Sequence, residues 1–226
     1  MFFGVREKVV GYVYIVSIIS LKQCKLNRFV RIFFQKVAHK QTIAITKEQY
    51  KEIIEVIKEG FSWNGVSYRA NNRIATILVL QANLGLRLGD IMSLKLSDII
   101  KDGDRYRLDI IEAKTGKART FTVPGEIYRY IQVYALENGL KDRLFSISER
   151  AVQKHLKAVG EYLGLEKLGS HSFRKFYATS IYVANNYNIE LVRQLLQHGS
   201  VKTTQRYIGI SETEVEKAIA GHMCLL

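Results

Sequence analysis

The stretch GSHSFRKFYA, residues 169–178, places a histidine and an arginine three positions apart at the start of an apolar segment. Residues three apart share one face of an α-helix, so the side chains of His171 and Arg174 can meet at a single anion. A guanidinium grips phosphate oxygens through paired N–H donors, and an imidazole adds a further hydrogen-bonding group. The pair therefore predicts an anion site, provided that other segments supply partners.

Four further residues could supply those partners. Arg87 stands between two expected helices, and Lys114 begins a tight turn between two expected strands. His198 is expected in the last turn of an amphipathic helix that ends at Gly199, and Tyr207 follows nine residues later. Each also has an ordinary explanation, because cationic side chains favour helix C-termini, turn lysines are commonly solvated, and the chain has 13 tyrosines.

Taken together, these residues form an ordered series of motifs: LGLRLGD, AKTGKAR, HSFRK, LLQHGS and TTQRYIG. The series resembles the active site of the tyrosine recombinases, the phage-integrase family, and the resemblance extends over roughly residues 45–220. A histidine and an arginine three apart, followed by a Leu-Leu-x-His-x-Ser box and a tyrosine, make a specific pattern. The resemblance implies a catalytic set of Arg87, Lys114, His171, Arg174, His198 and Tyr207.

The resemblance also implies a reaction in which Tyr207 attacks a DNA phosphate and forms a 3′-phosphotyrosyl bond. The residue types suit that chemistry, because the negative charge of the phosphate spreads over more oxygens in the transition state. Arg87 and Arg174 are expected to grip these oxygens, with His171 and His198 donating further hydrogen bonds. The cations would do the electrostatic work of a metal, so neither a metal ion nor another cofactor nor ATP is expected.

Two proton transfers remain to be assigned. A free tyrosine has a pKa near 10, so the cationic cluster is expected to stabilise the phenolate of Tyr207. By resemblance, His171 handles the proton of the nucleophile and Lys114 is the general acid for the leaving 5′-oxygen. Asp90 resembles the acidic residue that supports Arg87 in the family, but it is equally well explained as a first-turn acid at a helix N-terminus.

The charge of the chain favours a polyanionic partner. Lys and Arg number 34 against 21 Asp and Glu, which gives a net charge of +13. We expect double-stranded DNA, bound by a homo-oligomer that is a tetramer on paired sites during the reaction. The residues expected to contact DNA outside the catalytic set are Lys117, Arg119 and Arg73.

Residues 9–21 are apolar and follow two basic residues, as in a signal peptide, but the run is too short to span a bilayer and no small-residue cleavage site follows it. We therefore expect no membrane association, although a peripheral membrane protein would also explain the charge. The two cysteines, Cys24 and Cys224, form no disulfide framework and suit a reducing cytoplasm. The isoleucine- and lysine-rich composition hints at a bacterial or phage source.

Hydrophobic periodicity predicts a mainly α fold with a small three-stranded antiparallel β-sheet, an α+β class. A capping box from Thr46 to Gln49 opens the first helix, and Gly85 ends the second. A short helix is expected just after Arg87, and the remaining helices at 126–138, 148–163, 172–185, 189–197 and 211–220. The strands are expected at 97–100, 104–113 and 117–124, joined by Gly-bearing turns.

The expected domains are an N-terminal segment, residues 1–44, and a catalytic DNA breaking–rejoining domain, residues 45–226. Members of the family normally carry a helical DNA-binding domain before the catalytic one, and residues 1–44 could be a remnant of it. Two alternatives to a site-specific recombinase stay open. One is a truncated DNA-binding remnant that no longer recombines, and the other is an enzyme like the type IB topoisomerases.

Overall fold

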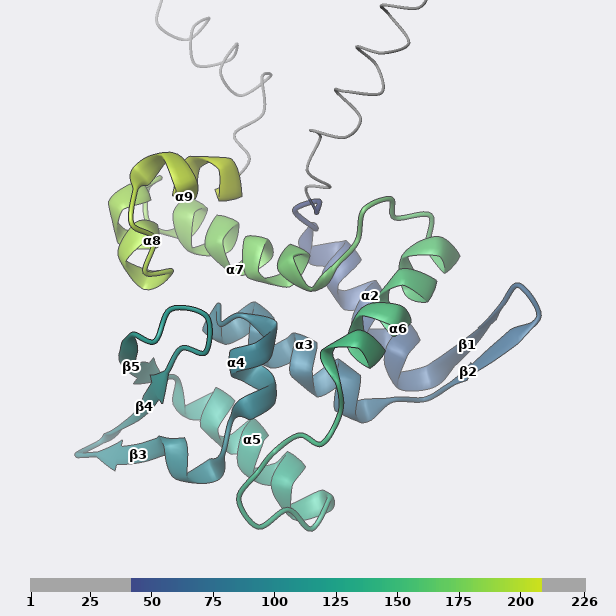
Figure 1. The fold of residues 1–226 in the computed structure, drawn as a ribbon, viewed down its shortest axis with the longest axis horizontal. Helices are drawn as coiled ribbons and strands as arrows, with labels where there is room; N and C mark the ends of the chain where they lie inside the picture. The colour runs from purple at the N-terminus through teal and green to yellow at the C-terminus, as the bar shows by residue number, and fades with distance from the viewer. Residues whose placement is uncertain (1–41, 209–226) are drawn as a thin grey trace, which may run out of the picture. The chain divides into compact units, whose positions relative to one another are not determined.

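The computed structural model describes residues 42–208 (Figure 1). The expected N-terminal segment, residues 1–44, therefore lies almost entirely outside the described residues, as does the expected helix 211–220. Within the described range, no helix is long and apolar enough to cross a membrane.

The first described helix, α2 (Lys47–Glu59), begins at the predicted capping box. The Thr46 side chain accepts from the Gln49 backbone, and the Gln49 side chain accepts from the Thr46 backbone. These two bonds satisfy backbone donors that the start of a helix otherwise leaves unpaired. The isoleucines of the helix, Ile53, Ile54 and Ile57, are buried as its apolar spacing predicts.

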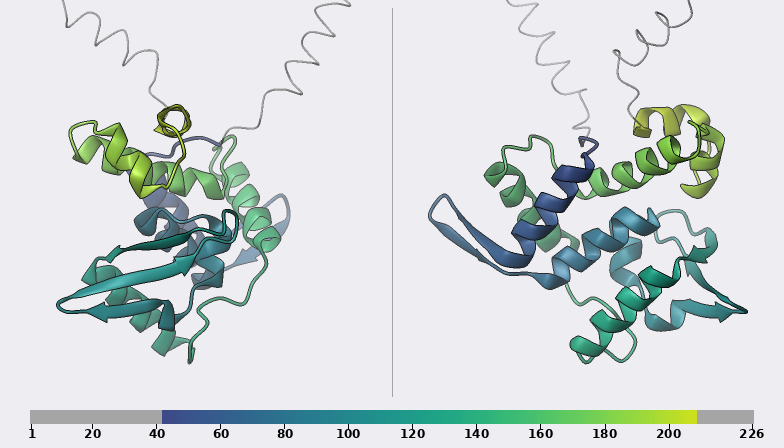
Figure 2. Two further views of the ribbon diagram at one scale, coloured as in Figure 1. Left: turned by 60° about the vertical axis from the view of Figure 1, so that its left-hand side comes forward. Right: turned by 180° about the vertical axis from the view of Figure 1, so that it is seen from behind.

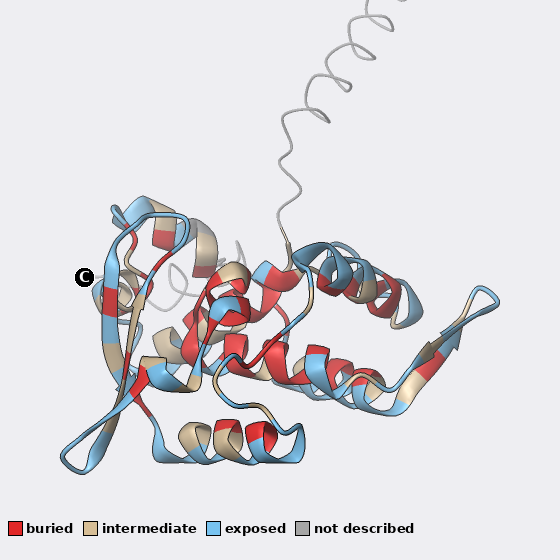
Figure 3. Cartoon of the chain, turned by 60° about the horizontal axis from the view of Figure 1, so that its bottom comes forward, coloured by how far each residue is buried: buried red, intermediate tan, exposed pale blue. Residues whose placement is uncertain are grey.

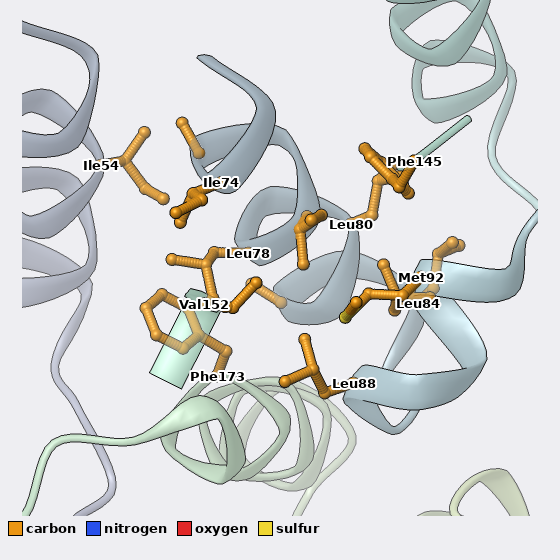
Figure 4. Packing of buried hydrophobic residues seen from close by; sticks show 14 of the residues in the cluster. Ile54, Ile74, Leu78, Leu80, Leu84, Leu88, Met92, Phe145, Val152 and Phe173 are labelled. Atoms are coloured by element: carbon orange, nitrogen blue, oxygen red, sulfur yellow. The ribbon is translucent and has the colours of Figure 1, made fainter. Parts of the chain in front are cut away.

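The central helix of the domain is α3 (Asn72–Leu84), which is buried along most of its length. Figure 4 shows its side chains Ile74, Leu78 and Leu80 packed among residues from several other helices, including Phe173 of α7 (Ser170–Ala184). A helix that is apolar nearly all round has to be surrounded by other elements. Because α3 ends at Gly85 in the left-handed conformation, this buried helix fixes where the next segment begins.

An antiparallel hairpin, β1 (Gly60–Trp63) and β2 (Val66–Arg69), separates α2 from α3 and was not predicted. Its turn is Asn64–Gly65, with both residues at positive φ, which is the commonest sequence of a two-residue hairpin turn. Its tip is exposed, as Figure 3 shows. Near its base, the Phe61 ring stacks on that of Tyr68, with centroids 4.6 Å apart.

The predicted three-stranded antiparallel sheet is present, in the order β3 (Ile99–Asp102), β4 (Arg105–Ile111) and β5 (Ala118–Val123). The chain reaches the sheet through α4 (Leu88–Ser93) and a short 3₁₀ turn, Leu96–Asp98, so the first strand begins two residues later than expected. Helix α5 (Gly125–Glu137) packs against the sheet through Tyr128, whose ring stacks on Tyr106.

The remaining helices are α6 (Glu149–Tyr162), α7, α8 (Ile189–Leu195) and α9 (Val201–Ile208). In Figures 1 and 2, α7, α8 and α9 lie together above the turn that joins β4 to β5. They share a small core of their own, formed by Ala178, Val192, Leu196 and Ile208. Helix α9 was not predicted, and it is the helix that carries Tyr207.

Candidate active site

Arg87 lies at the junction of α3 and α4, as predicted, and forms the N-cap position of α4. Its neighbours Leu86 and Leu88 are buried, so the backbone is anchored on both sides while the Arg87 side chain stays 20% exposed. Its Nη1 atom donates to Oε2 of Glu112 at 2.5 Å. One nitrogen of the guanidinium is therefore held by Glu112, and part of the side chain remains accessible to solvent.

Arg174 on α7 is almost completely buried, with 1% of its surface exposed. Its Nη1 atom donates to the carbonyl oxygen of Gly85 at 2.6 Å, and its Nη2 atom donates to that of Leu196 at 3.0 Å. Burial lowers its pKa to about 10, which still leaves it charged at neutral pH. Arg174 thus joins the end of α3 to the end of α8.

Gly85 makes this arrangement possible. Its φ of +61° is a conformation that other residues adopt only with strain, and a Cβ atom there would lie 2.3 Å from the ring of Tyr177. Tyr177 is one turn after Arg174 on α7, so the close approach of α7 to Gly85 also brings the guanidinium to the Gly85 carbonyl.

A cavity of about 380 Å³ opens beside these residues. Arg87, Lys114 and His171 line it together, so three members of the predicted set from α4, the β4–β5 turn and α7 face one space. Glu149 and Gln153 of α6 close its other side. Lys114 is exposed at the β4–β5 turn, where its side chain is free to move toward a bound ligand.

His198 and Tyr207 lie next to this group. The His198 ring centroid is 5.1 Å from that of Tyr207, in an edge-on arrangement, and the His171 ring centroid is 6.4 Å away. The Nδ1 atom of His198 is 3.0 Å from the hydroxyl of Thr204, a buried residue of α9. This hydrogen bond orients the imidazole and ties the α8–α9 loop to the helix that carries the tyrosine.

The prediction that His198 lies in the last turn of a helix ending at Gly199 is wrong. Helix α8 ends at Leu195, and His198 lies in the following loop. The turn out of the helix is made by Gln197, whose φ is +53°, instead of by the glycine. The side-chain amide of Gln197 donates to the backbone oxygen of Ala118, so the β-sheet supplies the contact that stabilises this turn.

The two histidines are uncharged at neutral pH in this structure. Burial, followed by the positive charges of Arg174 and Arg87, lowers the pKa of His198 to about 4. Partial burial and the same arginines, together with Lys114, also lower the pKa of His171. A neutral imidazole can donate one hydrogen bond and accept a proton at its other nitrogen, whereas a charged imidazolium only donates.

The expected stabilisation of the Tyr207 phenolate is only partly present. Burial raises the pKa of Tyr207 above its ordinary value, and the opposing effects of Arg174 and Arg87 do not cancel that increase. The cations therefore reduce the cost of forming the phenolate, but they leave the tyrosine protonated in the free protein. Two neutral imidazoles lie beside the ring, that of His198 with its centroid 5.1 Å away and that of His171 at 6.4 Å.

Asp90 does not pair with Arg87 as the resemblance suggested. It is 3% exposed, and its Oδ1 atom accepts from the backbone N–H of Ala113 at 2.9 Å. The carboxylate that holds Arg87 is Glu112. Asp90 therefore anchors the turn that carries Lys114 to the helix that follows Arg87.

Sequence reasoning missed Glu112 and Lys175. Glu112 is fully buried and directly follows β4. The sequence did contain a sign of this, because a charged residue that continues a strand after two isoleucines is unusual. Lys175 is 9% exposed, and its Nζ atom donates to the backbone oxygen of Thr42 at 2.6 Å and lies 5.9 Å from the centroid of the Tyr207 ring. Nothing in the sequence separates this lysine from the many solvated ones.

The residues expected to contact DNA outside the catalytic set occupy different environments. Arg119 is 3% exposed and donates to Glu112 and to the Leu195 carbonyl, so this expectation was wrong and its role is internal. Arg73 lies in the first turn of α3, the end away from Arg87, and donates to the Ser146 carbonyl. Lys117 is exposed in the β4–β5 turn, and its contact with DNA stays a prediction.

No cluster of three or more His, Cys, Asp or Glu side chains that could hold a metal ion occurs among residues 42–208. The charged side chains that line the cavity are those of Arg87 and Lys114 on one hand and of Asp90 and Glu149 on the other.

The sequence model of the phage integrase family matches residues 44–214, a range that contains all six residues of the predicted catalytic set. The chain belongs to the phage integrase family.

Relatives with curated names include tyrosine recombinase XerC of Caldanaerobacter subterraneus, which is 28% identical over 197 residues, 81% of this chain and 52% of that protein. Tyrosine recombinase XerA of Pyrococcus furiosus is 26% identical over 186 residues, 78% of this chain and 60% of that protein. A probable integrase/recombinase of Acholeplasma phage L2 is 28% identical over 158 residues, 67% of this chain and 52% of that protein. This integrase-family chain thus spans little more than half the length of these relatives.

Solved structures confirm the predicted fold class. XerA recombinase superposes with a TM-score of 0.59 at 23% identity, over 82% of this chain and 67% of that one. XerH recombinase bound to its difH substrate superposes at 0.57 and 21% identity, over 78% and 53%. The catalytic domain of bacteriophage HP1 integrase gives 0.55 at 16% identity, over 80% of this chain and 96% of that domain. The described fold is that of a tyrosine recombinase catalytic domain.

Proposed function

We propose that this chain is a site-specific DNA recombinase that cuts and rejoins strands through a covalent bond between Tyr207 and a 3′-phosphate. The observation that carries the proposal is the convergence of five side chains from four separate segments near one tyrosine. These side chains are Arg87, Lys114, His171, Arg174 and His198, with Tyr207 beside the two histidines.

The arginines supply the binding of the phosphate. Arg87 offers its free N–H groups at the cavity, while Arg174 adds fixed positive charge from a buried position. Charges held in a partly buried site act more strongly on a phosphate than they would in water, and they need no rearrangement as negative charge develops. Electrostatic stabilisation of the transition state is therefore assigned to these two residues.

The proton balance follows from the protonation states. As the Tyr207 oxygen forms its bond to phosphorus, its proton passes to the neutral imidazole of His171. As the bond from phosphorus to the 5′-oxygen breaks, Lys114 donates a proton to that oxygen. One phosphodiester replaces another of similar energy, so a 5′-hydroxyl of a second strand can reverse the attack without ATP.

The wider assignments rest on the family. Duplex DNA is the proposed partner, with a homotetramer on paired sites during exchange and a cytoplasmic, DNA-associated location. Because the chain spans little more than half the length of its relatives, recombination by the whole protein is part of the proposal. A binding-only remnant is not favoured, since all six residues expected at the site lie within the range that matches the family and three of them line one cavity.

The test is covalent trapping on a library of nicked duplexes with random sequence around the nick. The nick lets the short 5′-hydroxyl fragment diffuse away, so the wild-type protein accumulates as an adduct that survives SDS. Tyr207→Phe should abolish the adduct while DNA affinity changes by less than about threefold. Tyr187→Phe, at an exposed tyrosine beyond the end of α7, is the matched control and should react normally. An adduct that persists in Tyr207→Phe would refute the assignment of the nucleophile.

A further inference from the structure

Glu112 is an unexpected residue for a site that binds phosphate. Its carboxylate is fully buried, and a negative charge beside the proposed phosphate site opposes the binding of DNA. Burial alone would raise its pKa, but hydrogen bonds from Arg87 and Thr115 and the positive charges nearby lower that pKa below its ordinary value on balance. The side chain is therefore a buried carboxylate ion. Because burying a charge costs free energy, a role for this residue is to be expected.

The contacts of Glu112 define that role. Its Oε2 atom accepts from Nη1 of Arg87 at 2.5 Å and from the hydroxyl of Thr115 at 2.9 Å. Its Oε1 atom accepts from Nη1 of Arg119 at 3.1 Å. Both oxygens are thus occupied, and each of the three donors comes from a different part of the chain.

Two of those donors, Arg87 and Thr115, belong to segments that carry proposed catalytic side chains, and the third, Arg119 of β5, bonds to the end of the helix that precedes His198. Thr115 is in the same turn as Lys114, so the carboxylate holds the turn of the general acid. Arg119 donates with its Nη2 atom to the Leu195 carbonyl at 2.7 Å, at the end of α8 and three residues before His198. One carboxylate therefore connects the α3–α4 junction, the β4–β5 turn and the α8–α9 loop.

We propose that Glu112 is a positioning residue, which fixes the direction of the Arg87 guanidinium and holds it in register with the turn of Lys114 and the loop of His198. The inference rests on the proposed function, because it concerns the same site. An unheld arginine has several rotatable bonds and many orientations, whereas a charge-assisted hydrogen bond to one nitrogen leaves the others aimed in a fixed direction.

This role makes a prediction that separates it from a contribution to stability. Glu112→Gln removes the negative charge next to the phosphate, so the affinity for DNA should stay the same or increase by up to about threefold. Glutamine has one acceptor oxygen where Glu112 has two, and its NH2 group cannot accept from an arginine, so the charge-assisted bonds to Arg87 and Arg119 cannot both be kept. Arg87 is then held less firmly, so the rate of adduct formation at saturating DNA should fall by about 10- to 100-fold. We expect no loss of DNA affinity in this variant. A lower rate of adduct formation at unchanged affinity indicates that the Arg87 side chain is misplaced.

The experiment measures single-turnover adduct formation and DNA affinity with nicked duplexes obtained from the library selection. Asp109→Asn is the matched control, because Asp109 is on β4 just before Glu112 and also pairs with an arginine, Arg107, but does not line the cavity. It should react at the wild-type rate. Glu112→Asp keeps the charge on a shorter arm and should restore part of the lost rate.

Glu112→Gln could also react slowly because part of the protein is unfolded. A second variant tests for this effect, and each rate is divided by the fraction of protein that is folded. Thr115→Val removes one exposed-turn donor to Glu112 and leaves both buried ion pairs, so it should keep the melting temperature and lose about two- to fivefold in rate. The inference is overturned if Glu112→Gln reacts at the wild-type rate per folded molecule. It is equally overturned if its entire loss appears as weaker DNA binding.

Arginine side-chain ¹⁵N NMR spectra test the positioning without DNA or turnover. The Nε–H signal of Arg87, assigned with Arg87→Lys, should be sharp in the wild-type protein and broadened or exchanged in Glu112→Gln. A wild-type protein that forms no adduct but shows this dependence would refute the proposed function and retain the positioning. An Arg87 signal unaffected by Glu112→Gln would refute the positioning even if the protein cuts DNA.

Discussion

The buried carboxylate of Asp90 accepts a hydrogen bond from the backbone N–H of Ala113, so the residue before Lys114 is fixed to the helix that begins after Arg87. Removing this acceptor in Asp90→Ala frees the β4–β5 turn. We expect single-turnover cleavage to fall by about tenfold or more, because the general acid is less often in place. Asp90→Asn keeps an acceptor oxygen and should recover most of the rate. Equal loss in both variants would show that the charge of Asp90 matters and not its contact with the turn.

Gly85 and Gly103 both have a φ of +61°, but only Gly85 has close neighbours. Alanine at Gly103 should cost about 1–2 kcal/mol of unfolding free energy from backbone strain alone. Alanine at Gly85 adds a clash with the Tyr177 ring and should cost about 2–5 kcal/mol in total. Urea denaturation of the two variants measures the difference. Equal costs would mean that α7 can move away from Gly85 without penalty.

The low pKa of His198 predicts a pH dependence of stability. Its folded pKa of about 4 lies below its unfolded value of about 6.5, so the folded state excludes a proton that the unfolded state binds. The contribution of His198 is therefore complete above about pH 6.5 and is lost as the pH falls toward about 4, on the order of 3 kcal/mol in all. Urea titrations of wild type and His198→Gln should show a shallower slope in the variant. A slope unchanged by the substitution would contradict a buried neutral His198.

Cleavage should depend on pH through His171. At low DNA concentration the rate reports the groups of the free protein, and His171 must be neutral to accept the tyrosine proton. Because burial and the neighbouring cations lower its pKa, the rate should rise with pH to a plateau with a midpoint below about 6.5. His171→Gln should react slowly and lose this acid limb. A midpoint above about 7 would exclude His171 as the acceptor.

The salt dependence of binding distinguishes the two exposed cations that were expected to contact DNA. Each phosphate contact contributes about 0.9 to the slope of log affinity against log salt concentration. Lys117→Ala should reduce that slope by about 1, because Lys117 lies in the turn beside the site. Arg73→Ala is the control and should leave it unchanged, since Arg73 is engaged with Ser146 at the other end of α3. A reduced slope in Arg73→Ala and an unchanged slope in Lys117→Ala would mean that the duplex passes over the other end of α3.

Local signals account for the parts of the fold that were predicted. The capping box at Thr46, the terminating Gly85 and the alternating strands around two Gly-bearing turns each act within a few residues, so the sequence alone specifies them. The β1–β2 hairpin also had a local signal, Asn64–Gly65, but its strands are short and half exposed and lack a clear alternation.

The missed features of the site depend on contacts between distant segments. Glu112 and Arg119 meet within the β4–β5 hairpin, but Arg87 reaches Glu112 from the α3–α4 junction and Arg119 bonds to the end of α8. The pairing of Arg87 with Glu112 and the burial of Arg119 are therefore not visible in the spacing of residues along the chain. Helix α9 is eight residues long and polar on average, and its apolar partners come from α7 and α8. The pKa of Tyr207 likewise depends on how deeply that packing buries the ring.

Arg174 is bonded to carbonyl oxygens at residues 85 and 196, positions far apart in the chain, and Tyr207 comes later still. Protein synthesis proceeds from the N-terminus, so the nucleophile leaves the ribosome after every other member of the proposed set. A nascent chain that has emerged only through α7 has neither the second anchor of its buried arginine nor a tyrosine to attack with. Under the proposed function, the order of residues along the chain thereby delays the capacity to break DNA until translation has passed Tyr207.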